Sequence, residues 1–361
     1  MADRSQRDDG ERELAGGSEV GGYRIERLLG RGGMGAVYEA TQLSLQRRVA
    51  LKVIAPRLGA DEAFRARFRR EARAAAAVEH PNLLPIHEAG ELPEGALFIA
   101  MRLVDGGDLE SRLRAIGPLG AGEALPLLGQ LADALDGAHA AGLIHRDVKP
   151  ANVLLEQRRG GVHAYLTDFG LVKDVESSTL GHTDTGQLLG TVDYMAPEQI
   201  AGEDYGAGVD VYAFGALAYR ALTGSVPYRR ETVAATLVAH REAPIPVASE
   251  RSPGLPPAFD RLVARAMAKD PDWRARSAGE LMRELAEQLS AGAEEAVRPD
   301  ESPTVADGPQ STARAHASPQ TTPTRAIESD GGKPSLIRQT VIYAAAFTPI
   351  WVVTYIIGRN L

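Results

Sequence analysis

The 361-residue sequence contains no cysteine, which excludes disulfide scaffolds, thiolate zinc sites and catalysis by a thiol nucleophile. It also lacks a basic excess: 40 Lys and Arg stand against 48 Asp and Glu, which argues against a nucleic-acid-binding protein. The first 20 residues contain no apolar run, so no cleavable secretion signal is expected. The hydrophobic content of 44% suffices for a large packed core, which excludes a chain disordered throughout.

Changes in composition along the chain predict five regions. These are a disordered leader over 1–22, a folded domain over 23–289, a disordered linker over 290–338, a transmembrane helix over 339–358 and a short tail over 359–361. The linker is expected because 16 of the 37 residues from 299 to 335 are Pro, Ser or Thr. Such a composition buries too little apolar surface to offset the entropy of the chain.

The predicted membrane segment is a run of 20 uncharged residues from Gln339 to Gly358, flanked by Arg338 and Arg359. A helix of that length spans about 30 Å, which matches the hydrocarbon core of a bilayer. A buried core helix is the alternative, but the linker before this run leaves no domain to cover it. The sequence therefore predicts a single-pass membrane anchor.

The folded region begins with strand-like patterns, followed by helical ones. The expected early elements are strands at 23–29, 36–41 and 49–54 and a helix at 61–78. From about residue 121 helical patterns dominate, with loops around 145–152 and 168–197. A small β-rich part followed by a larger helical part predicts an α+β fold with a cleft between the two parts.

The segment Gly30-Arg31-Gly32-Gly33-Met34-Gly35 fits G-x-G-x-x-G, which alone is a weak signal. A dinucleotide-binding site requires a helix directly after the glycines, whereas here the chain continues as a predicted strand. The glycines are therefore expected in a hairpin, where backbone N–H groups can approach phosphate oxygens without a Cβ in the way. A plain tight turn is the alternative.

Lys52 lies 17 residues after Gly35, on the third predicted strand and among apolar neighbours. An isolated lysine on a strand is usually only solvated. Here the apolar neighbours are expected to hold the stem while the ammonium reaches a polar site. Glu71, on the predicted helix, is the candidate opposite charge that positions this ammonium.

The most specific signal is the segment His145-Arg146-Asp147-Val148-Lys149-Pro150-Ala151-Asn152, in which a proline excludes a regular helix. Its carboxylate, ammonium and amide can orient a hydroxyl, neutralise a migrating phosphoryl group and bind a hard cation. Asp168-Phe169-Gly170 follows a predicted strand and adds a second candidate Mg²⁺ ligand. A satisfied polar turn is the alternative, and the second motif argues against it.

In order and spacing, these motifs resemble those of Hanks-type, eukaryotic-like serine/threonine protein kinases, above all the membrane-anchored bacterial members. The resemblance covers 23–289 and includes V-A-L-K, H-R-D-x-K-P-x-N, D-F-G, G-T and A-P-E. It implies a two-lobed protein-kinase fold, with an N-lobe over 23–104 and a C-lobe over 105–289. It also implies transfer of the ATP γ-phosphate to Ser or Thr hydroxyls of proteins, with Mg²⁺ or alternatively Mn²⁺.

The resemblance further implies the residues that bind ATP. The phosphates would be covered by Leu29, Gly30, Arg31, Gly32, Gly33, Met34, Gly35, Ala36 and Val37. Lys52 would contact the α- and β-phosphates while paired to Glu71. Met101 would be the gatekeeper beside the adenine, followed by a hinge from Arg102 to Val104. Arg102 stands where relatives often have Glu, which affects little because the hinge binds adenine through its backbone.

The same resemblance implies the catalytic and metal-binding residues. Asp147 would accept or orient the proton of the acceptor hydroxyl, Lys149 would steady the γ-phosphate, and Thr191 would help to seat the acceptor. Asn152 and Asp168 would hold Mg²⁺.

Three further matches are structural. Glu198 of A-P-E resembles the glutamate that pairs with a late arginine, for which Arg274 is the better match and Arg276 the alternative. Asp210 resembles the helix aspartate that braces the catalytic loop.

Thr183 and Thr185 match the spacing of autophosphorylated activation-loop threonines in bacterial relatives. A phosphate there would carry about −1.5 to −2 charges and could pair with Arg146, which would order the loop. Ordinary loop threonines are the alternative. The linker threonines, in acidic or proline-rich settings, are further candidates that would dock phosphothreonine-reading domains, or they merely reflect linker composition; they are Thr304, Thr321, Thr322 and Thr324.

The predicted function is a membrane-tethered serine/threonine kinase whose catalytic domain faces the cytoplasm, where ATP is. Protein substrates and no nucleic acid are the expected partners, and the resemblance also implies a homodimer through the smaller lobe. A pseudokinase is the second hypothesis, opposed by the complete catalytic set. A small-molecule phosphotransferase is the third, opposed by the G-T and A-P-E segment, which builds a protein-substrate platform in the family.

Overall fold

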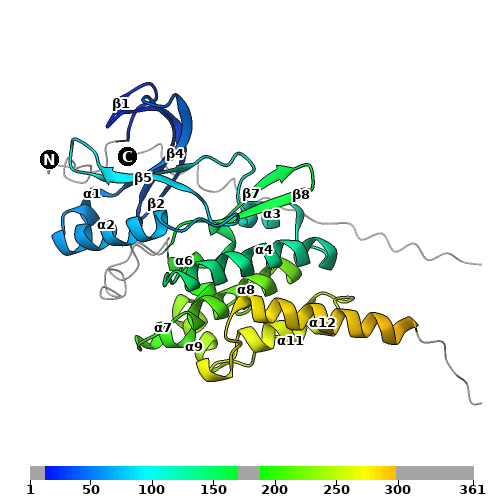
Figure 1. Ribbon diagram of the computed structural model, residues 1–361. Helices are drawn as coiled ribbons and strands as arrows, with labels where there is room; N and C mark the ends of the chain where they lie inside the picture. Colours follow the sequence, from blue (N-terminus) through cyan, green and yellow to red (C-terminus); the bar gives the residue numbers. More distant parts are fainter. Residues whose placement is uncertain (1–12, 170–187, 298–361) are drawn as a thin grey trace, which may run out of the picture. The chain divides into compact units, whose positions relative to one another are not determined.

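The computed structural model describes residues 13–169 and 188–297 (Figure 1). The larger sheet is antiparallel, with the strand order β1-β2-β3-β4-β6-β5. Its strands are β1 Glu19–Val20, β2 Tyr23–Gly32, β3 Gly35–Gln42, β4 Arg47–Ile54, β5 Ile86–Glu91 and β6 Leu97–Arg102. The smaller sheet is a hairpin of β7 Val153–Arg158 and β8 Gly161–Leu166.

Most helices follow the larger sheet along the chain. Those before β7 are α1 Pro56–Gly59, α2 Glu62–Ala76, α3 Leu109–Ile116 and α4 Ala121–Ala140, with the 3₁₀ turn η1 Pro150–Asn152. Those after β8 are α6 Leu188–Thr191, α7 Pro197–Ala201, α8 Gly208–Thr223, α9 Val233–Glu242, α10 Ala248–Arg251, α11 Pro257–Ala266 and α12 Ala278–Val297, with the 3₁₀ turns η2 Val192–Tyr194 and η3 Pro271–Trp273.

Helix α2 packs on the larger sheet through one apolar stripe. Phe64 and Phe68, one helical turn apart, are both 1% exposed and contact Ile54, Leu97 and Ile99 of the sheet. The helix begins at Asp61, whose carboxylate accepts a hydrogen bond from the amide of Ala63. The apolar stripe therefore fixes α2, and with it Glu71, against the N-lobe sheet.

Helix α8 is the centre of the C-lobe core. Every residue from Val209 to Leu222 is buried, as expected for a helix that is apolar on nearly all sides. It packs against α4 and α11, and α12 in turn packs against both of these helices (Figure 1). This core includes Val148 from the loop that carries Asp147, and α8 itself carries Asp210.

The expected α+β arrangement of two lobes is confirmed. The three expected early strands and the expected helix correspond to β2, β3, β4 and α2. The strand expected before Asp168 corresponds to β8, whereas its hairpin partner β7, directly after η1, was not expected. Short strands of this kind carry too few residues for a clear periodic pattern.

Two ends of the folded domain differ from the sequence-based boundaries. Strand β1 falls inside the expected leader and pairs with β2, and Val20 is only 7% exposed. Two large apolar residues in a charged stretch, Leu14 and Val20, form no periodic pattern, and both pack against the apolar cluster of the larger sheet. Helix α12 continues to Val297, beyond the expected boundary at 289.

Across 13–169 and 188–297, no helix combines the length and the apolar character needed to cross a bilayer. The predicted span at 339–358 lies outside the described residues.

Candidate active site

The glycine segment forms the end of the β2–β3 hairpin, as expected, and no helix follows it. Gly32 pairs with Gly35, and Gly30 pairs with Val37. Gly35 has φ of +136°, and a Cβ at this position would come within 2.0 Å of the carbonyl oxygen of Val53. Only glycine therefore fits between the hairpin and β4.

An apolar cluster lies where the adenine is expected. Its buried members are Ala50, Leu84, Met101 and Tyr165, and Val37, Leu103, Val104 and Leu154 pack against it. The structure thus brings together three predicted residues: Val37 from the hairpin, Met101 from β6 and Val104 from the hinge. Leu154 was not predicted, because its place opposite the N-lobe depends on the β7–β8 hairpin.

Lys52 reaches across to the D-F-G aspartate. Its Nζ lies 2.8 Å from Oδ1 of Asp168, and the lysine side chain is 14% exposed. Among the contacts between described residues, none joins Lys52 to Glu71, so the expected pair stays a prediction. Instead, Oε1 of Glu71 lies 4.0 Å from Nη1 of Arg146. The carboxylates of Asp168 and Glu71 are both candidate partners of the Lys52 ammonium, and the position of α2 decides which of them lies within contact distance.

The catalytic-loop residues converge as predicted. Nζ of Lys149 lies 2.9 Å from Oδ2 of Asp147 and donates a hydrogen bond of 3.0 Å to Oγ1 of Thr191. Nδ2 of Asn152 donates to the same Asp147 oxygen at 3.1 Å and to the Asp147 carbonyl at 2.8 Å. The Asp147 side chain is 10% exposed, so these contacts fix its carboxylate in one orientation.

Asp210 braces this loop from α8. Its fully buried carboxylate accepts hydrogen bonds from the amides of His145 and Arg146, both at 2.7 Å. The brace holds Arg146 at φ of +63°, a left-handed conformation that costs free energy in a non-glycine residue. His139 on α4 contacts the same carboxylate at 2.7 Å, a partner that sequence reasoning missed.

His145 is the second residue that sequence reasoning left without a role. Its Nε2 lies 2.9 Å from the carbonyl oxygen of Thr167, and its Nδ1 accepts from the amide of Asp147 at 3.3 Å. Complete burial lowers the pKa of the imidazole, which favours the neutral ring. A neutral ring with its proton on Nε2 satisfies both contacts, and it links the catalytic loop to the strand end before Asp168.

Asn152 and Asp168, the predicted magnesium ligands, carry the amide and carboxylate oxygens that this ion prefers. Asp168, two residues after β8, has φ of +60°, a left-handed conformation that costs free energy in a non-glycine residue. No group of three or more His, Cys, Asp or Glu residues suited to a metal ion occurs in the described part of the chain. Mg²⁺ commonly binds through one or two protein oxygens together with substrate phosphates, so a sparse donor set agrees with that chemistry.

Glu198 and Arg274 form a buried ion pair. Nη2 of Arg274 lies 2.7 Å from Oε2 of Glu198, and its Nη1 contacts the other carboxylate oxygen. The two side chains are 1% and 6% exposed. The structure places Arg274 against Glu198, whereas Arg276 is exposed and its amide donates to Glu280.

Asp193, two residues after Thr191, gives a testable pH dependence. Burial raises its pKa from 3.8 to about 6, and Arg229 opposes that shift. The folded state thus holds this proton more tightly than the unfolded chain, so the stability from protonation is complete below about pH 4 and lost as the pH rises through about 6. Asp193→Asn should therefore raise Tm relative to the parent protein more at pH 7.5 than at pH 4.5.

After discounting for partial exposure, the gain in the free energy of unfolding from Asp193→Asn should be larger at pH 7.5 than at pH 4.5 by on the order of 1 kcal/mol. This corresponds to a gain in Tm that is larger by about 2–4 °C. Differential scanning fluorimetry of both proteins at the two pH values measures it. Because all other groups are shared, only the variant-minus-parent difference is compared. An equal Tm difference at both pH values would contradict this assignment.

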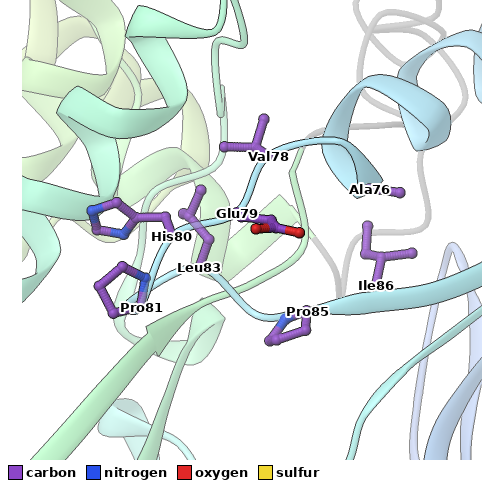
Figure 2. A pocket seen from close by; sticks show the side chains of 8 residues that line it. All are labelled: Ala76, Val78, Glu79, His80, Pro81, Leu83, Pro85 and Ile86. Atoms are coloured by element: carbon purple, nitrogen blue, oxygen red, sulfur yellow. The ribbon is translucent and has the colours of Figure 1, made fainter.

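Two cavities of the described part of the chain differ in their relation to these residues. The smaller, lined by Met101, Asp168, Phe169 and five apolar or neutral neighbours, lies between the gatekeeper and the D-F-G motif. The larger, of about 470 Å³, lies away from Asp147 at the end of α2 (Figure 2). Apolar side chains and Glu79 line it, together with His80 and two prolines, and it contains none of the predicted site residues.

The predicted phosphorylation sites Thr183 and Thr185 lie outside the described residues, as do the four linker threonines. Their assignment stays a prediction.

Comparison with known proteins agrees with this geometry. Residues 23–285 match the model of the protein kinase domain family. The serine/threonine-protein kinase PknJ of Mycobacterium tuberculosis is 46% identical over 284 residues, which are 78% of this chain and 48% of that protein. PknD of the same organism is 44% identical over 266 residues, covering 73% of this chain and 39% of PknD. The chain thus aligns with about half or less of these relatives.

Among solved structures, the M. tuberculosis PknI kinase domain superimposes with a TM-score of 0.62 at 35% identity, covering 76% of this chain and all of that domain. The matched family region spans the hairpin, the catalytic loop and the Glu198–Arg274 pair. The chain belongs to the protein kinase domain family, among bacterial relatives of the serine/threonine type.

Proposed function

We propose that this protein is an active serine/threonine protein kinase that transfers the ATP γ-phosphate to protein hydroxyl groups. The observation that carries the proposal is the convergence of Asp147, Lys149, Asn152 and Thr191, with Lys52 and Asp168 in contact beside them. All charged groups needed for phosphoryl transfer are present, which argues against a pseudokinase.

Each of these residues has a separate role in phosphoryl transfer. Bound ATP with Mg²⁺ supplies the phosphoryl group and a positive charge beside it. Asp147 orients the acceptor hydroxyl and takes its proton, while Lys149 and Asn152 hold the carboxylate through its Oδ2. Lys149 neutralises charge on the transferred group, and Thr191, in contact with Lys149, helps to seat the acceptor. Lys52 binds the other phosphates.

The test is transfer of radiolabelled phosphate from ATP to a generic basic protein, followed by analysis of the labelled amino acids. Phosphoserine and phosphothreonine are expected, and their absence with every acceptor would reject the proposal. Label on small-molecule hydroxyls alone would instead support a small-molecule phosphotransferase.

We further propose that the enzyme phosphorylates its own Thr183 and Thr185. Arg146 lies beside Glu71 at the catalytic loop, so an added phosphate would offer its guanidinium a competing anion. Replacing both threonines by alanine should lower phosphate incorporation by intact-mass analysis and should lower activity about tenfold or more. The matched control is Thr223→Ala on α8, whose hydroxyl donates to the Tyr219 and Ser225 carbonyls and accepts from the Ser225 amide. Active enzyme without phosphate on either threonine would contradict this proposal.

A membrane anchor at 339–358 with a cytoplasmic kinase domain is proposed from the sequence alone. Its support is the 20-residue uncharged run and the basic residues before it. Fractionation of cells that express the full chain or residues 1–338 tests it. The full chain should sediment with membranes and the truncated chain should not.

A further inference from the structure

A cluster of charged and aromatic side chains spans the hinge between the two lobes. Nη2 of Arg102, at the end of β6, lies 2.9 Å from Oε1 of Glu156 on β7. The same guanidinium lies 5.2 Å from the ring centroid of Tyr165 on β8. Arg158 contacts the other Glu156 oxygen at 2.7 Å and also lies 5.7 Å from the Tyr165 ring. We call these four residues the hinge strap.

The strap joins two parts of the chain that are fixed independently. Arg102 belongs to the N-lobe sheet, where it pairs with Val49 and its amide bonds to the Pro85 carbonyl. On the other side of the hinge, the carbonyl of Gly107 accepts from the amide of Leu155 on β7 at 2.9 Å. A Cβ on Gly106 would come within 1.9 Å of the Leu155 carbonyl oxygen, so the backbone there lies directly on β7.

The segment between these anchors contains Leu103, Val104 and Asp105 and joins β6 to α3. Short connecting segments of this kind absorb the backbone changes when two lobes rotate relative to each other. The side-chain contact of Arg102 bridges this short segment. A change in lobe angle therefore has to stretch or break the Arg102–Glu156 contact.

The Glu156 carboxylate is held in its charged form by the two arginines that bond to it. Burial alone would raise the pKa of the Glu156 carboxyl, but hydrogen bonds from Arg158 and Arg102 outweigh it and lower that pKa. Tyr165 is 3% exposed, so its ring is a rigid face on which the Arg102 guanidinium rests. Glu156 thus stays ionised at neutral pH and keeps both arginines in place.

We propose that Arg102 is a positioning residue whose contacts with Glu156 and Tyr165 restrict opening of the lobes and so slow nucleotide release. It acts through the hinge and touches neither acceptor nor phosphate. The part of the inference that concerns nucleotide rests on the proposed kinase function, whereas restricted lobe opening does not.

The first experiment measures lobe opening without any nucleotide. Because the chain has no cysteine, spin labels can be placed at L45C in the N-lobe and I116C in the C-lobe, where the native residues are 63% and 61% exposed. Pulsed dipolar spectroscopy then gives the distribution of distances between the labels. Arg102→Met should broaden this distribution, and Arg102→Lys, which keeps the charge, should stay close to the parent.

The second experiment measures dissociation of a fluorescent ADP analogue with Mg²⁺ by stopped flow. Arg102→Met and Glu156→Gln should each raise the dissociation rate about three- to tenfold, with a matching rise in KM for ATP and no fall in kcat. Arg265→Met is the matched control, because Arg265 is similarly exposed and pairs with Glu284 far along the chain from the hinge. Its distances and rates should equal those of the parent.

The two readouts separate the possible failures. An unchanged distance distribution in Arg102→Met would overturn the proposal, as would unchanged ADP dissociation in both strap variants that remain folded by Tm. Equal effects of the Lys and Met variants would also overturn it, because charge would then be irrelevant. If the parent protein transfers no phosphate, the kinase function is rejected. The distribution of distances between the spin labels would still test whether Arg102 restricts lobe opening.

Discussion

Asp147→Asn is expected to lower kcat by a factor of about 10²–10⁴, the usual contribution of a positioned acid–base group. The amide cannot take the proton of the acceptor hydroxyl. It has nearly the shape of the carboxylate and can still accept from Lys149 and Asn152, whose nitrogens lie 2.9 and 3.1 Å from Oδ2. The loss should therefore appear in kcat, with little change in KM for ATP.

Initial rates of label transfer to a basic protein, at several ATP concentrations, measure this effect. Asp133→Asn is the matched control, because Asp133 lies exposed on α4 and outside the predicted site. Its kcat should equal that of the parent, and Tm should be nearly the same for all three proteins. A folded Asp147→Asn enzyme with more than a tenth of the parent kcat would contradict the role of Asp147.

Removal of one partner of the Glu198–Arg274 pair is expected to destabilise the C-lobe by about 3–5 kcal/mol, because it leaves an uncompensated buried charge. The two side chains are 6% and 1% exposed. Arg274 also donates to the carbonyls of Ala268, Gly208 and Lys269. Arg274→Ala would thus leave these three backbone acceptors without their donor as well.

For a domain of this size the expected loss corresponds to a Tm lower by about 6–20 °C. Glu198→Gln, Arg274→Ala and the control Arg276→Ala can be compared by thermal unfolding and by urea titration. The exposed Arg276 should change stability by no more than about 0.5 kcal/mol. Equal losses of stability in Arg274→Ala and Arg276→Ala would show that the buried ion pair contributes no more to stability than an exposed arginine. If Arg274→Ala proves insoluble, the stability of Glu198→Gln is compared with that of Arg276→Ala.

Much of the candidate site could be predicted because its residues are close in sequence. Asp147, Lys149 and Asn152 lie within six positions, and a short loop with Pro150 cannot separate them widely. The hairpin was predictable for a similar reason, since glycines followed by a strand pattern leave the chain few alternatives. The buried pair of Glu198 with Arg274 was reached only through resemblance to a family, because 76 positions separate the two residues.

Other contacts had no local signal. The partner of Lys52 depends on where α2 places Glu71, and no pattern in the sequence fixes that position. His139 and Leu154 reach the site only because α4 lies beside α8 and because β7 lies under the hinge. Arg102 was recognised as an unusual hinge residue, but its contact with Glu156 required the fold of the β7–β8 hairpin.

The amino-acid order alone determined the set of reactive groups, the two-part α+β plan and the loops that carry the chemistry, since each depends on neighbours within a few residues. The tertiary structure decided which of two carboxylates contacts Lys52 and which arginine pairs with Glu198. It also decided that Arg102 contacts Glu156 across the hinge. These choices depend on the packing of elements distant in sequence, where a shift of a few ångströms replaces one charged partner by another.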